Sequence, residues 1–377
     1  MRLEDLDVDV PQELIAQEPA ETRDLCRLML MRADSRLGHH RFGELPELLR
    51  PGDLLVLNDS RVIPARVNAR KPTGGDVELL FVRPAVVPRT RGVATAVAAG
   101  QPGNGKPPGQ EGAAASDVWE VLARPSHRLR PGGLLLVGSE ELELGESLGD
   151  GKWLVSGPPG LSMLALMNEH GRMPLPPYIK TYPDDPSSYQ TVYAREPGSA
   201  AAPTAGLHFT PELLGALAAK GIRSAFVTLH VGLDTFLPIR EARVEDHLIH
   251  TEAYSVSCSA MTAITDARET GRRVIAVGTT ATRVLETLAS KKLLGSGGGV
   301  SGFTSIFITP GYDFQVVDVL LTNLHLPRSS VLALTMSFAG IDAIRHAYAE
   351  AVALRYRFFS FGDAMLIERP SAVRVSA

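Results

Sequence analysis

Residues 210–231 read TPELLGALAAKGIRSAFVTLHV, and this stretch decides the fold class. Thr210 is a hydroxyl residue suited to cap a helix, and Pro211 suits the first helical position. Gly221 stands where a helix that began at Pro211 would end, because glycine readily adopts the left-handed conformation. The apolar, β-branched run that follows predicts a strand at 224–231. A capped helix leading directly into a strand is typical of an α/β layer.

The same alternation continues towards the C-terminus. We expect Ser259 to cap a helix that ends before Gly271. The elements predicted after it are a strand at 273–280, a helix at 281–289, a linker at 295–302, a strand at 305–309 and helices at 329–339 and 341–355. Strands and helices in this order predict an α/β main domain.

A different pattern occupies residues 61–154. Short strands without intervening helices are predicted at 77–84, 117–125, 132–138 and 152–157, which indicates a small all-β domain. The Gly-, Pro- and Ala-rich stretch at about 84–116 predicts a flexible surface loop within it. The main domain is then discontinuous and comprises residues 1–60 and 155–377.

Composition narrows the class of protein. The chain has 377 residues, 44% of them apolar, and a net charge of −4, which favours a globular protein with a substantial core. Its apolar runs are too short to span a bilayer, and its first residues lack the apolar segment of a signal peptide. Two cysteines, Cys26 and Cys258, give no disulfide framework, so we expect a cytoplasmic protein.

Positive charge is concentrated in one segment. Residues 61–130 carry eleven Lys or Arg and five Asp or Glu. A basic segment in an acidic protein can bind a polyanion such as RNA. A solvated face in a chain with 31 Arg is an equally good interpretation.

Candidate chemistry gathers near the middle of the chain. The segments YQTVYAREPGSAAAPTAGLHFT (189–210) and TLHVGLDTFLPI (228–239) place His208 and His230 beside Gly- and Pro-containing turns. Loops on a rigid frame commonly carry functional residues. Neither a GxGxxG fingerprint on a strand–helix turn nor a Walker A motif is present, which leaves a nicotinamide-type nucleotide site without support.

A second candidate is GTTATRVLE at 278–286. A strand that ends at Gly278 and a helix that begins after Thr279 and Thr280 would offer free N–H groups to an anion. Arg283 and Glu286 stand one turn apart and share a helix face. An ordinary helix cap with a surface ion pair is the alternative.

Three further segments contain polar residues of interest. His247 and His250 in EDHLIHTE have carboxylates nearby but no third ligand at metal-binding spacing, so we expect no metal site. TNLHLPRSS supplies Asn323, His325 and Arg328 before a helix. RFFSFGDAMLI places Asp363 after a glycine turn, where a core residue would be apolar.

These motifs resemble one known family. The segments that carry the resemblance are PGDLLVLNDSRVIPAR (51–66), GRMPLPPYI (171–179), YQTVYA (189–194), AAPTAGLHF (201–209), TLHVG (228–232), VIAVGTT (274–280), TNLHLP (322–327), YRFFS (356–360) and GDAM (362–365). Together they are similar to the S-adenosylmethionine:tRNA ribosyltransferase-isomerases of queuosine biosynthesis. The resemblance covers nearly all of the chain except about 84–116.

The resemblance implies a fold and a reaction. The fold is an α/β main domain with an inserted β-barrel domain. The reaction transfers and isomerises the ribosyl group of S-adenosylmethionine onto 7-aminomethyl-7-deazaguanine at the wobble position of tRNA, giving epoxyqueuosine-tRNA, adenine and methionine. S-adenosylmethionine would be a consumed substrate, with no separate cofactor, and the family resemblance favours a monomer.

This chemistry assigns expected roles to residues. It needs a general base and a general acid, for which histidine suits neutral pH best. The candidates for these two roles are His208, His230, His325, Glu286 and Asp363. The expected substrate-binding residues are Tyr189, Tyr193, Thr204, Gly206, Thr279, Thr280, Arg283, Asn323 and Arg328. The expected tRNA-binding residues are Arg61, Arg66, Arg70, Lys71, Arg124 and Arg128.

Four positions depart from the family pattern. They are Asp234 in place of a small residue, Ala281 in place of Ser, Leu324 in place of Phe and Phe361 in place of Tyr. A divergent paralogue that uses S-adenosylmethionine with another acceptor is therefore one alternative. A tRNA-binding protein without catalysis is another, although a pure binder does not require a group of titratable residues.

Overall fold

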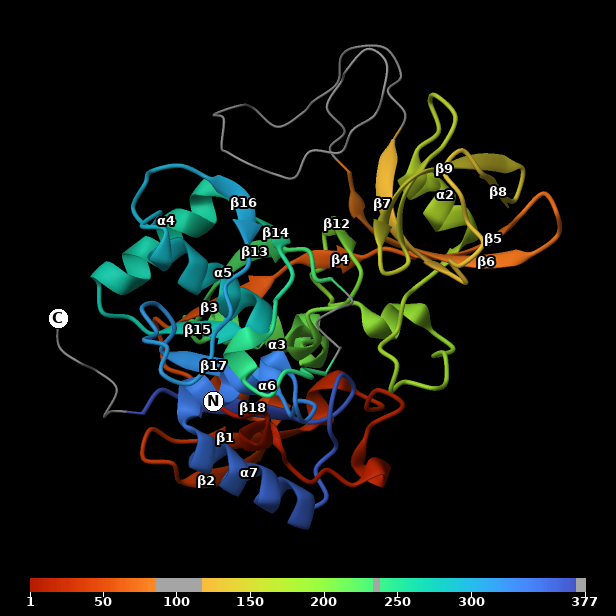
Figure 1. Ribbon diagram of the computed structural model, residues 1–377. Helices are drawn as coiled ribbons and strands as arrows, with labels where there is room; N and C mark the ends of the chain where they lie inside the picture. The colour runs from red at the N-terminus through yellow and green to blue at the C-terminus, as the bar shows by residue number, and fades with distance from the viewer. Residues whose placement is uncertain (86–116, 233–237, 371–377) are drawn as a thin grey trace. The chain divides into compact units, whose positions relative to one another are not determined.

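The computed structural model describes residues 1–85, 117–232 and 238–370 (Figure 1). The chain forms two compact units. One unit comprises Met1–Val62 and Leu175–Ala377, and the other comprises Ile63–Pro174. The predicted loop at 84–116 lies almost entirely outside the described residues. Asp234 also lies outside them.

A mixed sheet of nine strands forms the centre of the first unit, with strand order β16–β14–β13–β3–β15–β17–β18–β1–β2 among the described residues. In that order the strands are Val300–Thr304, Glu252–Val256, Arg223–Leu229, Leu54–Asn58, Val274–Val277, Val319–Asn323, Ala364–Glu368, Arg27–Met31 and Leu37–Arg41. A separate parallel pair joins β4 (Ser60–Val62) to β12 (Glu196–Ser199).

The four strands β13, β3, β15 and β17 run parallel to one another in the middle of this sheet. The side chains of β3 are buried along its whole length. Antiparallel strands flank this parallel centre on both sides. Because the parallel strands end at the same edge, the segments that follow β13, β15 and β17 are brought together there, where open α/β sheets usually bind ligands.

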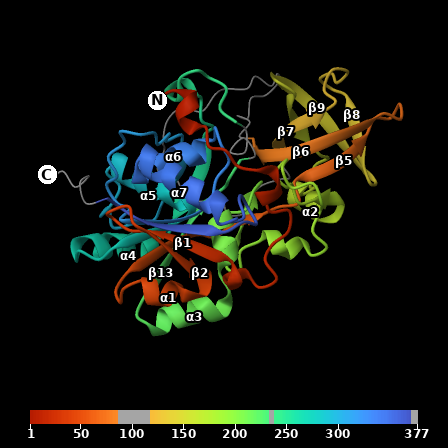
Figure 2. The ribbon, with the colours of Figure 1, turned by 90° about the horizontal axis from the view of Figure 1, so that it is seen from below.

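Both faces of the sheet are covered, because side chains of a strand alternate between faces. Leu54 and Val56 of β3 join the core that includes residues of α4, α5, α6 and α7, whereas Leu55 and Leu57 join the core that includes α1 and α3. Figure 2 shows α5, α6 and α7 on one side of the sheet and α1 and α3 on the other. The helices of this unit are α1 (Leu45–Leu48), α3 (Pro211–Ala219), α4 (Cys258–Glu269), α5 (Gly278–Ser290), α6 (Ser330–Ala339) and α7 (Ile341–Ala353).

Short 3₁₀ helices complete the unit. They are η1 (Leu3–Leu6), η2 (Gln12–Leu14), η3 (Arg23–Leu25), η4 (Phe42–Glu44), η5 (Pro186–Tyr189), η6 (Thr204–His208) and η8 (Val244–Asp246). The segment η6 leads directly into α3, whose N-cap Thr210 accepts a hydrogen bond from the amide of Leu213 at 3.1 Å, as the sequence predicted.

The second unit is a closed antiparallel barrel of six strands. β5 (Arg66–Arg70), β6 (Asp76–Pro84), β7 (Val118–Arg124), β10 (Lys152–Ser156), β9 (Glu140–Gly149) and β8 (Leu134–Val137) pair in that order, and β8 pairs back to β5. The helix α2 (Met163–His170) and the short strand β11 (Gly171–Arg172) follow the barrel strands, and β11 pairs with β5. The predicted fold class, an α/β domain with an inserted barrel-like domain, is confirmed.

Local details differ from the sequence predictions in three places. The strand expected at 305–309 lies earlier, as β16, because the Thr304 hydroxyl accepts from the Ile306 amide and Arg283 donates to the Ile306 carbonyl. Helix α4 is capped by Ser257 rather than Ser259. Helix α5 begins at Gly278, where a positive φ of 87° turns the chain directly out of β15.

Candidate active site

Two adjoining pockets lie where the parallel strands end. The first, here called the aromatic pocket, is lined among others by Tyr178, Thr204, Asn323, His325, Phe359 and Ser360. The second, here called the arginine pocket, is lined among others by His247, His250, Glu252, Arg283 and Phe307. Thr279, Thr280 and Val331 line both pockets. One ligand with an aromatic and a charged end could therefore occupy both.

The N-terminus of α5 separates the two pockets and is suited to hold an anion. The first helical residues carry no side-chain cap, so their amide N–H groups remain available. The hydroxyl of Thr280 is buried and has no hydrogen-bond partner among the described residues. A helix dipole adds positive potential at this end. The sequence prediction placed an anion site here for the same reason.

Arg283 lies one turn further along α5 and adds a fixed positive charge to the arginine pocket. Its side chain is buried, its Nη1 donates to Glu252 and its Nε donates to the Ile306 carbonyl at 3.2 Å. The Glu252 carboxylate also accepts from the Gly232 amide at 2.9 Å. The remaining nitrogen, Nη2, is buried and unpaired among the described residues. A carboxylate bound beside it would give this nitrogen an acceptor.

His325 is the one member of the predicted acid–base set that lines the aromatic pocket. Its Nε2 lies 2.6 Å from the Thr322 hydroxyl, and its backbone amide donates to Tyr348 at 2.6 Å. Burial lowers the pKa of His325 to about 3. The imidazole is therefore neutral near pH 7 and is a weak base.

His208 lies behind the aromatic pocket and does not line it. It is 4% exposed, with Nδ1 3.0 Å from Cys26 Sγ and Nε2 3.1 Å from Asn323 Nδ2. Its ring packs against Phe42 with centroids 5.0 Å apart. Burial lowers the pKa of His208 to about 3, so this histidine is also neutral.

His230 follows β13 and lines neither pocket. Its Nδ1 is buried without a partner among the described residues, and a side chain at Gly198 would meet its ring at 3.0 Å. Burial lowers the pKa of His230, and the charges of Glu196 and Asp59 oppose this shift. The structure therefore does not bring His208, His230 and His325 into one cluster.

Glu286 and Asp363 hold backbone segments in place. Glu286 Oε1 accepts the amides of Val316 and Val317 at 3.0 and 3.1 Å, and Oε2 accepts that of Gln315 at 2.9 Å. Asp363 accepts the amides of Arg27 and Arg357, each at 2.8 Å, and forms an ion pair with Arg27. Neither carboxylate lines the two pockets.

The two predicted substrate-binding tyrosines line neither pocket. Tyr189 is 0% exposed and packs against Phe361, and Tyr193 packs against Phe226. The Tyr193 hydroxyl would lie 2.0 Å from a Cβ at Gly206, which explains why this position requires glycine. Thr204 does line the aromatic pocket, whereas Arg328 is exposed and pairs with Asp7 at 2.8 Å.

Sequence reasoning missed the aromatic wall of the pocket. The rings of Tyr178 and Phe359 lie 4.9 Å apart, and the Tyr178 hydroxyl lies 2.6 Å from Ser360 Oγ. These residues stand in the quoted segments GRMPLPPYI and YRFFS. The available signal was a tyrosine after two prolines and a serine after two phenylalanines.

Three of the four departures from the family pattern lie in the core. Ala281 and Leu324 are 0% exposed and Phe361 is 4% exposed, and none of them lines either pocket. These three residues therefore lie outside the walls of both pockets.

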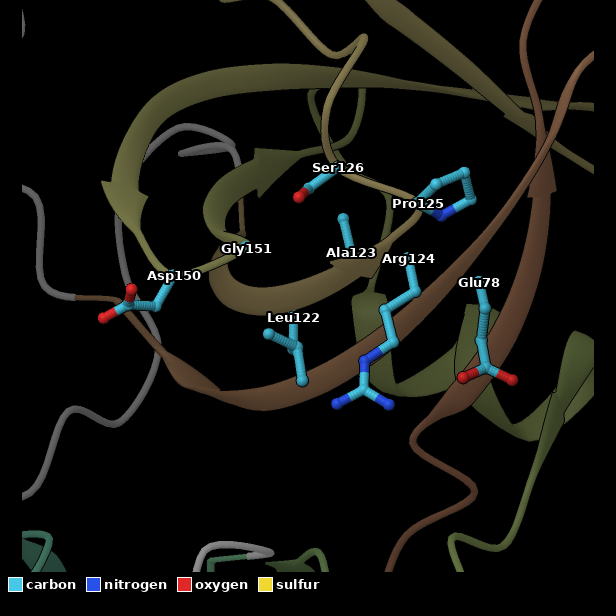
Figure 3. A pocket seen from close by; sticks show the side chains of 8 residues that line it. All are labelled: Glu78, Leu122, Ala123, Arg124, Pro125, Ser126, Asp150 and Gly151. Carbon is cyan, nitrogen blue, oxygen red and sulfur yellow. The ribbon is translucent and has the colours of Figure 1, made fainter.

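The barrel carries the other predicted set. Arg66 pairs with Glu78 at 3.5 Å and Arg70 pairs with Asp76 at 3.2 Å. A shallow hollow in the barrel is lined by Arg124 and Glu78 (Figure 3). Lys71, Arg124 and Arg128 form no ion pair within 4.0 Å with another described residue, and Arg61 lies on β4 of the first unit, exposed.

The described barrel unit is not basic as a whole. Its described residues include nine Lys or Arg and ten Asp or Glu. Among the residues the structure describes, no cluster of His, Cys, Asp and Glu could hold a metal ion. No helix in these ranges is long and apolar enough to cross a membrane.

Comparisons with known proteins agree with the pattern of residues. A family model described as "Queuosine biosynthesis protein" matches residues 3–367. The chain is similar to the S-adenosylmethionine:tRNA ribosyltransferase-isomerase of Rubrobacter xylanophilus, with 51% identity over 97% of this chain and 98% of the relative. The enzyme of the same name from Anaeromyxobacter sp. is 44% identical over 98% of this chain and 99% of its own length.

The chain is also similar to a solved structure over almost its whole length. The crystal structure of S-adenosylmethionine tRNA ribosyltransferase from Thermotoga maritima is 35% identical, with a TM-score of 0.52, over 96% of this chain and 99% of that chain. The similarity in sequence and in fold therefore extends over almost the whole chain.

Proposed function

The chain belongs to the S-adenosylmethionine:tRNA ribosyltransferase-isomerase family, and from this membership we propose which residues bind the substrates and carry the reaction. The enzyme transfers and isomerises the ribosyl group of S-adenosylmethionine onto 7-aminomethyl-7-deazaguanine in tRNA. Full-length relatives at 44% and 51% identity leave the divergent-acceptor and non-catalytic interpretations without support.

S-adenosylmethionine lies across the two pockets, with adenosine in the aromatic pocket and the methionine carboxylate in the arginine pocket. The observation that carries this proposal is the shared N-terminus of α5. Two buried donors there, Thr280 Oγ1 and Arg283 Nη2, have no partner among the described residues. Buried donors without an acceptor are unfavourable, and a carboxylate would satisfy both.

His325 is the general base of this proposal. The sulfonium group acidifies the C5′ protons, and a neutral imidazole at the pocket wall can remove one of them. Burial lowers its pKa to about 3, which leaves a ring nitrogen unprotonated in the resting enzyme although it also makes the imidazole a weak base. Thr322 orients the ring by its contact with Nε2.

The tRNA backbone contacts the cations of the barrel that have no carboxylate partner among the described residues, Lys71, Arg124 and Arg128. Phosphate contacts position a nucleic acid without reading its sequence. The arginines Arg66 and Arg70 are weaker candidates because each already faces a carboxylate. A tRNA substrate places the reaction in the cytoplasm.

The substrate arrangement is tested by Thr280→Val and Arg283→Gln, measured by the KM for S-adenosylmethionine at saturating modified tRNA. Thr280→Val keeps the shape of the side chain and removes its donor. We expect a KM increase of about 10-fold for Thr280→Val and of about 10- to 100-fold for Arg283→Gln, the range of one lost hydrogen bond to a charged group.

Arg328→Gln is the matched control, because Arg328 pairs with Asp7 at the surface and lines neither pocket. An unchanged KM in both Thr280→Val and Arg283→Gln, in protein with the wild-type circular dichroism spectrum, would place the methionine carboxylate elsewhere.

A further inference from the structure

The orientation of the Asn323 side-chain amide is fixed by its surroundings. Asn323 is the last residue of β17 and is 1% exposed. Its side-chain nitrogen lies 3.1 Å from the Phe359 carbonyl oxygen. A carbonyl oxygen can only accept a hydrogen bond, so the atom facing it must be the NH₂ group.

This orientation also fixes the proton of His208. The second N–H of Asn323 points to His208 Nε2 at 3.1 Å, so Nε2 must accept and the imidazole proton must lie on Nδ1. That proton faces Cys26 Sγ at 3.0 Å. Burial raises the pKa of Cys26, which keeps the sulfur a neutral thiol. Cys26, His208 and Asn323 therefore form a chain of hydrogen-bond contacts. In this chain each donor group faces an acceptor atom.

These contacts use both N–H groups of the Asn323 side chain, so its oxygen, Oδ1, is the polar atom left for a ligand. Its Oδ1 is buried and has no hydrogen-bond partner within residues 1–85, 117–232 and 238–370. Asn323 lines the aromatic pocket beside Phe359 and His325. A buried acceptor of this kind is expected to meet an N–H or O–H donor of the ligand.

We infer that Asn323 selects the adenine base by accepting a hydrogen bond from its 6-amino group, and that His208 is a positioning residue that holds Asn323 in this orientation. The inference rests on the proposed placement of S-adenosylmethionine. The methionine ammonium accompanies the carboxylate into the arginine pocket, and the ribose offers hydroxyls rather than a flat ring. The 6-amino group is the N–H donor of adenine, and the wall formed by Tyr178 and Phe359 suits a flat aromatic ring.

The test compares S-adenosylmethionine with S-inosylmethionine, in which an oxygen replaces the 6-amino group. An acceptor at this position would face the Asn323 oxygen, and a site built around a buried hydrogen bond rejects such an analogue strongly. We expect the wild-type enzyme to prefer S-adenosylmethionine by about 100-fold or more in kcat/KM, measured as purine release with the modified tRNA. A wild-type preference below about 3-fold would overturn the inference without any variant.

Variants then separate selection from folding. Asn323→Ala should reduce the preference to below about 10-fold, because no oxygen remains to discriminate. His208→Leu should reduce it by a smaller factor, because the Phe359 carbonyl still accepts from the Asn323 amide, whereas His208→Gln, which keeps an acceptor for that amide, should retain most of it. Equal preference in wild type, Asn323→Ala and His208→Leu would overturn the assignment.

Leu366→Ala serves as the control for loss of stability. Leu366 is buried in β18 and lines neither pocket, so this variant should melt at a lower temperature with an unchanged preference. Failure of the proposed substrate placement has a separate signature, which is an unchanged KM for S-adenosylmethionine in Thr280→Val and Arg283→Gln.

Discussion

At the scale of single residues, His208 illustrates how burial determines what a side chain can do. The sequence alone favoured it as an acid or base, because it stands beside Gly- and Pro-containing turns in a segment that resembles the family. In the folded protein its two nitrogens face Cys26 and Asn323, and Nε2 accepts a hydrogen bond. Its position behind the pocket makes it a support for Asn323 instead of a group that reaches the substrate.

The buried neutral state of His208 predicts a pH dependence of stability. Its pKa is lowered to about 3 in the folded protein, whereas an unfolded histidine titrates near about 6.5. Between these values the unfolded chain binds more protons, so the free energy of unfolding falls as the pH drops below 6.5, by up to about 1.4 kcal/mol per pH unit. Above about pH 6.5, His208 does not contribute to the pH dependence of the free energy of unfolding.

Urea midpoints at pH 7.5 and pH 5 measure this effect. His208→Gln should lose less stability between the two pH values than the wild type does. His346→Gln is the control, because the His346 side chain is 70% exposed. If His208→Gln and the wild type lose equal amounts, the group responsible for acid sensitivity is not His208.

The difference between His208 and His325 could not be predicted from the sequence. Both precede or follow apolar residues, and both are buried enough to have a lowered pKa. They differ because His325 follows β17 beyond its carboxyl end, whereas His208 packs under Asn323 against Phe42. The residues that surround His208, Phe42 and Asn323, each lie more than a hundred positions from it in the sequence.

At the scale of elements, α5 serves the active site with one end and the core with the rest. Its first residues and Arg283 line the pockets, and Glu286 one turn later binds the backbone of 315–317. Burial raises the pKa of Glu286, and the hydrogen bonds donated to it oppose that shift. We interpret Glu286 as a residue that fixes the loop before β17.

Glu286→Gln should therefore affect stability and leave substrate binding unchanged. The new NH₂ group would face amide N–H donors that it cannot accept from, and we expect a loss of about 2–4 kcal/mol in the free energy of unfolding. The KM for S-adenosylmethionine should stay within about 2-fold of the wild type. Chemical denaturation and steady-state kinetics of the same preparation measure both.

Glu269→Gln, in the exposed last turn of α4, is the comparison for a carboxylate without such contacts. A large rise in KM with normal stability for Glu286→Gln would instead assign Glu286 to the substrate.

Elements with strong local signals were predicted well. The cap and proline of α3 and the two C-terminal helices α6 and α7 all lie close to their expected positions. The strand expected at 305–309 was wrong, because the Ile306 carbonyl accepts from Arg283 of α5 instead of from a neighbouring strand. The acidic strand β9 (EELELGESLG) was missed, although its alternating Glu and Leu have the period of a strand.

At the scale of the whole molecule, two units of different construction share one chain. The fold class could be predicted because alternating helices and strands differ clearly from a run of short strands. The pairing of β1 with β18 and of β3 with β13 could not, because these partners are remote in sequence. The pockets depend on those pairings, so the wall of Tyr178 and Phe359 was beyond local patterns.

The cations of the barrel predict how tRNA binding depends on salt. Replacing Lys71, Arg124 and Arg128 together with Ala should raise the KM for tRNA by about 10-fold or more and leave the KM for S-adenosylmethionine unchanged. Each lost phosphate contact should also reduce the slope of the logarithm of the binding constant against the logarithm of the salt concentration, by about 0.7–0.9 in magnitude.

The double variant Arg66→Ala/Arg70→Ala removes charges that Glu78 and Asp76 already balance, and we expect a smaller effect. Equal affinities for tRNA in the wild type and the triple variant, over a range of salt concentrations, would place the RNA contact outside these residues.

The central position of β3 also has a consequence for synthesis on the ribosome. β3 is made early, yet its two neighbours in the sheet are β13 and β15, which emerge only after the barrel is complete. At translation rates of about 5–20 residues per second, the apolar segment LLVLN waits on the order of ten seconds without a partner strand. The barrel contains all of its own strand pairs and can close first. The nascent α/β unit is therefore the part of the chain that most needs a chaperone.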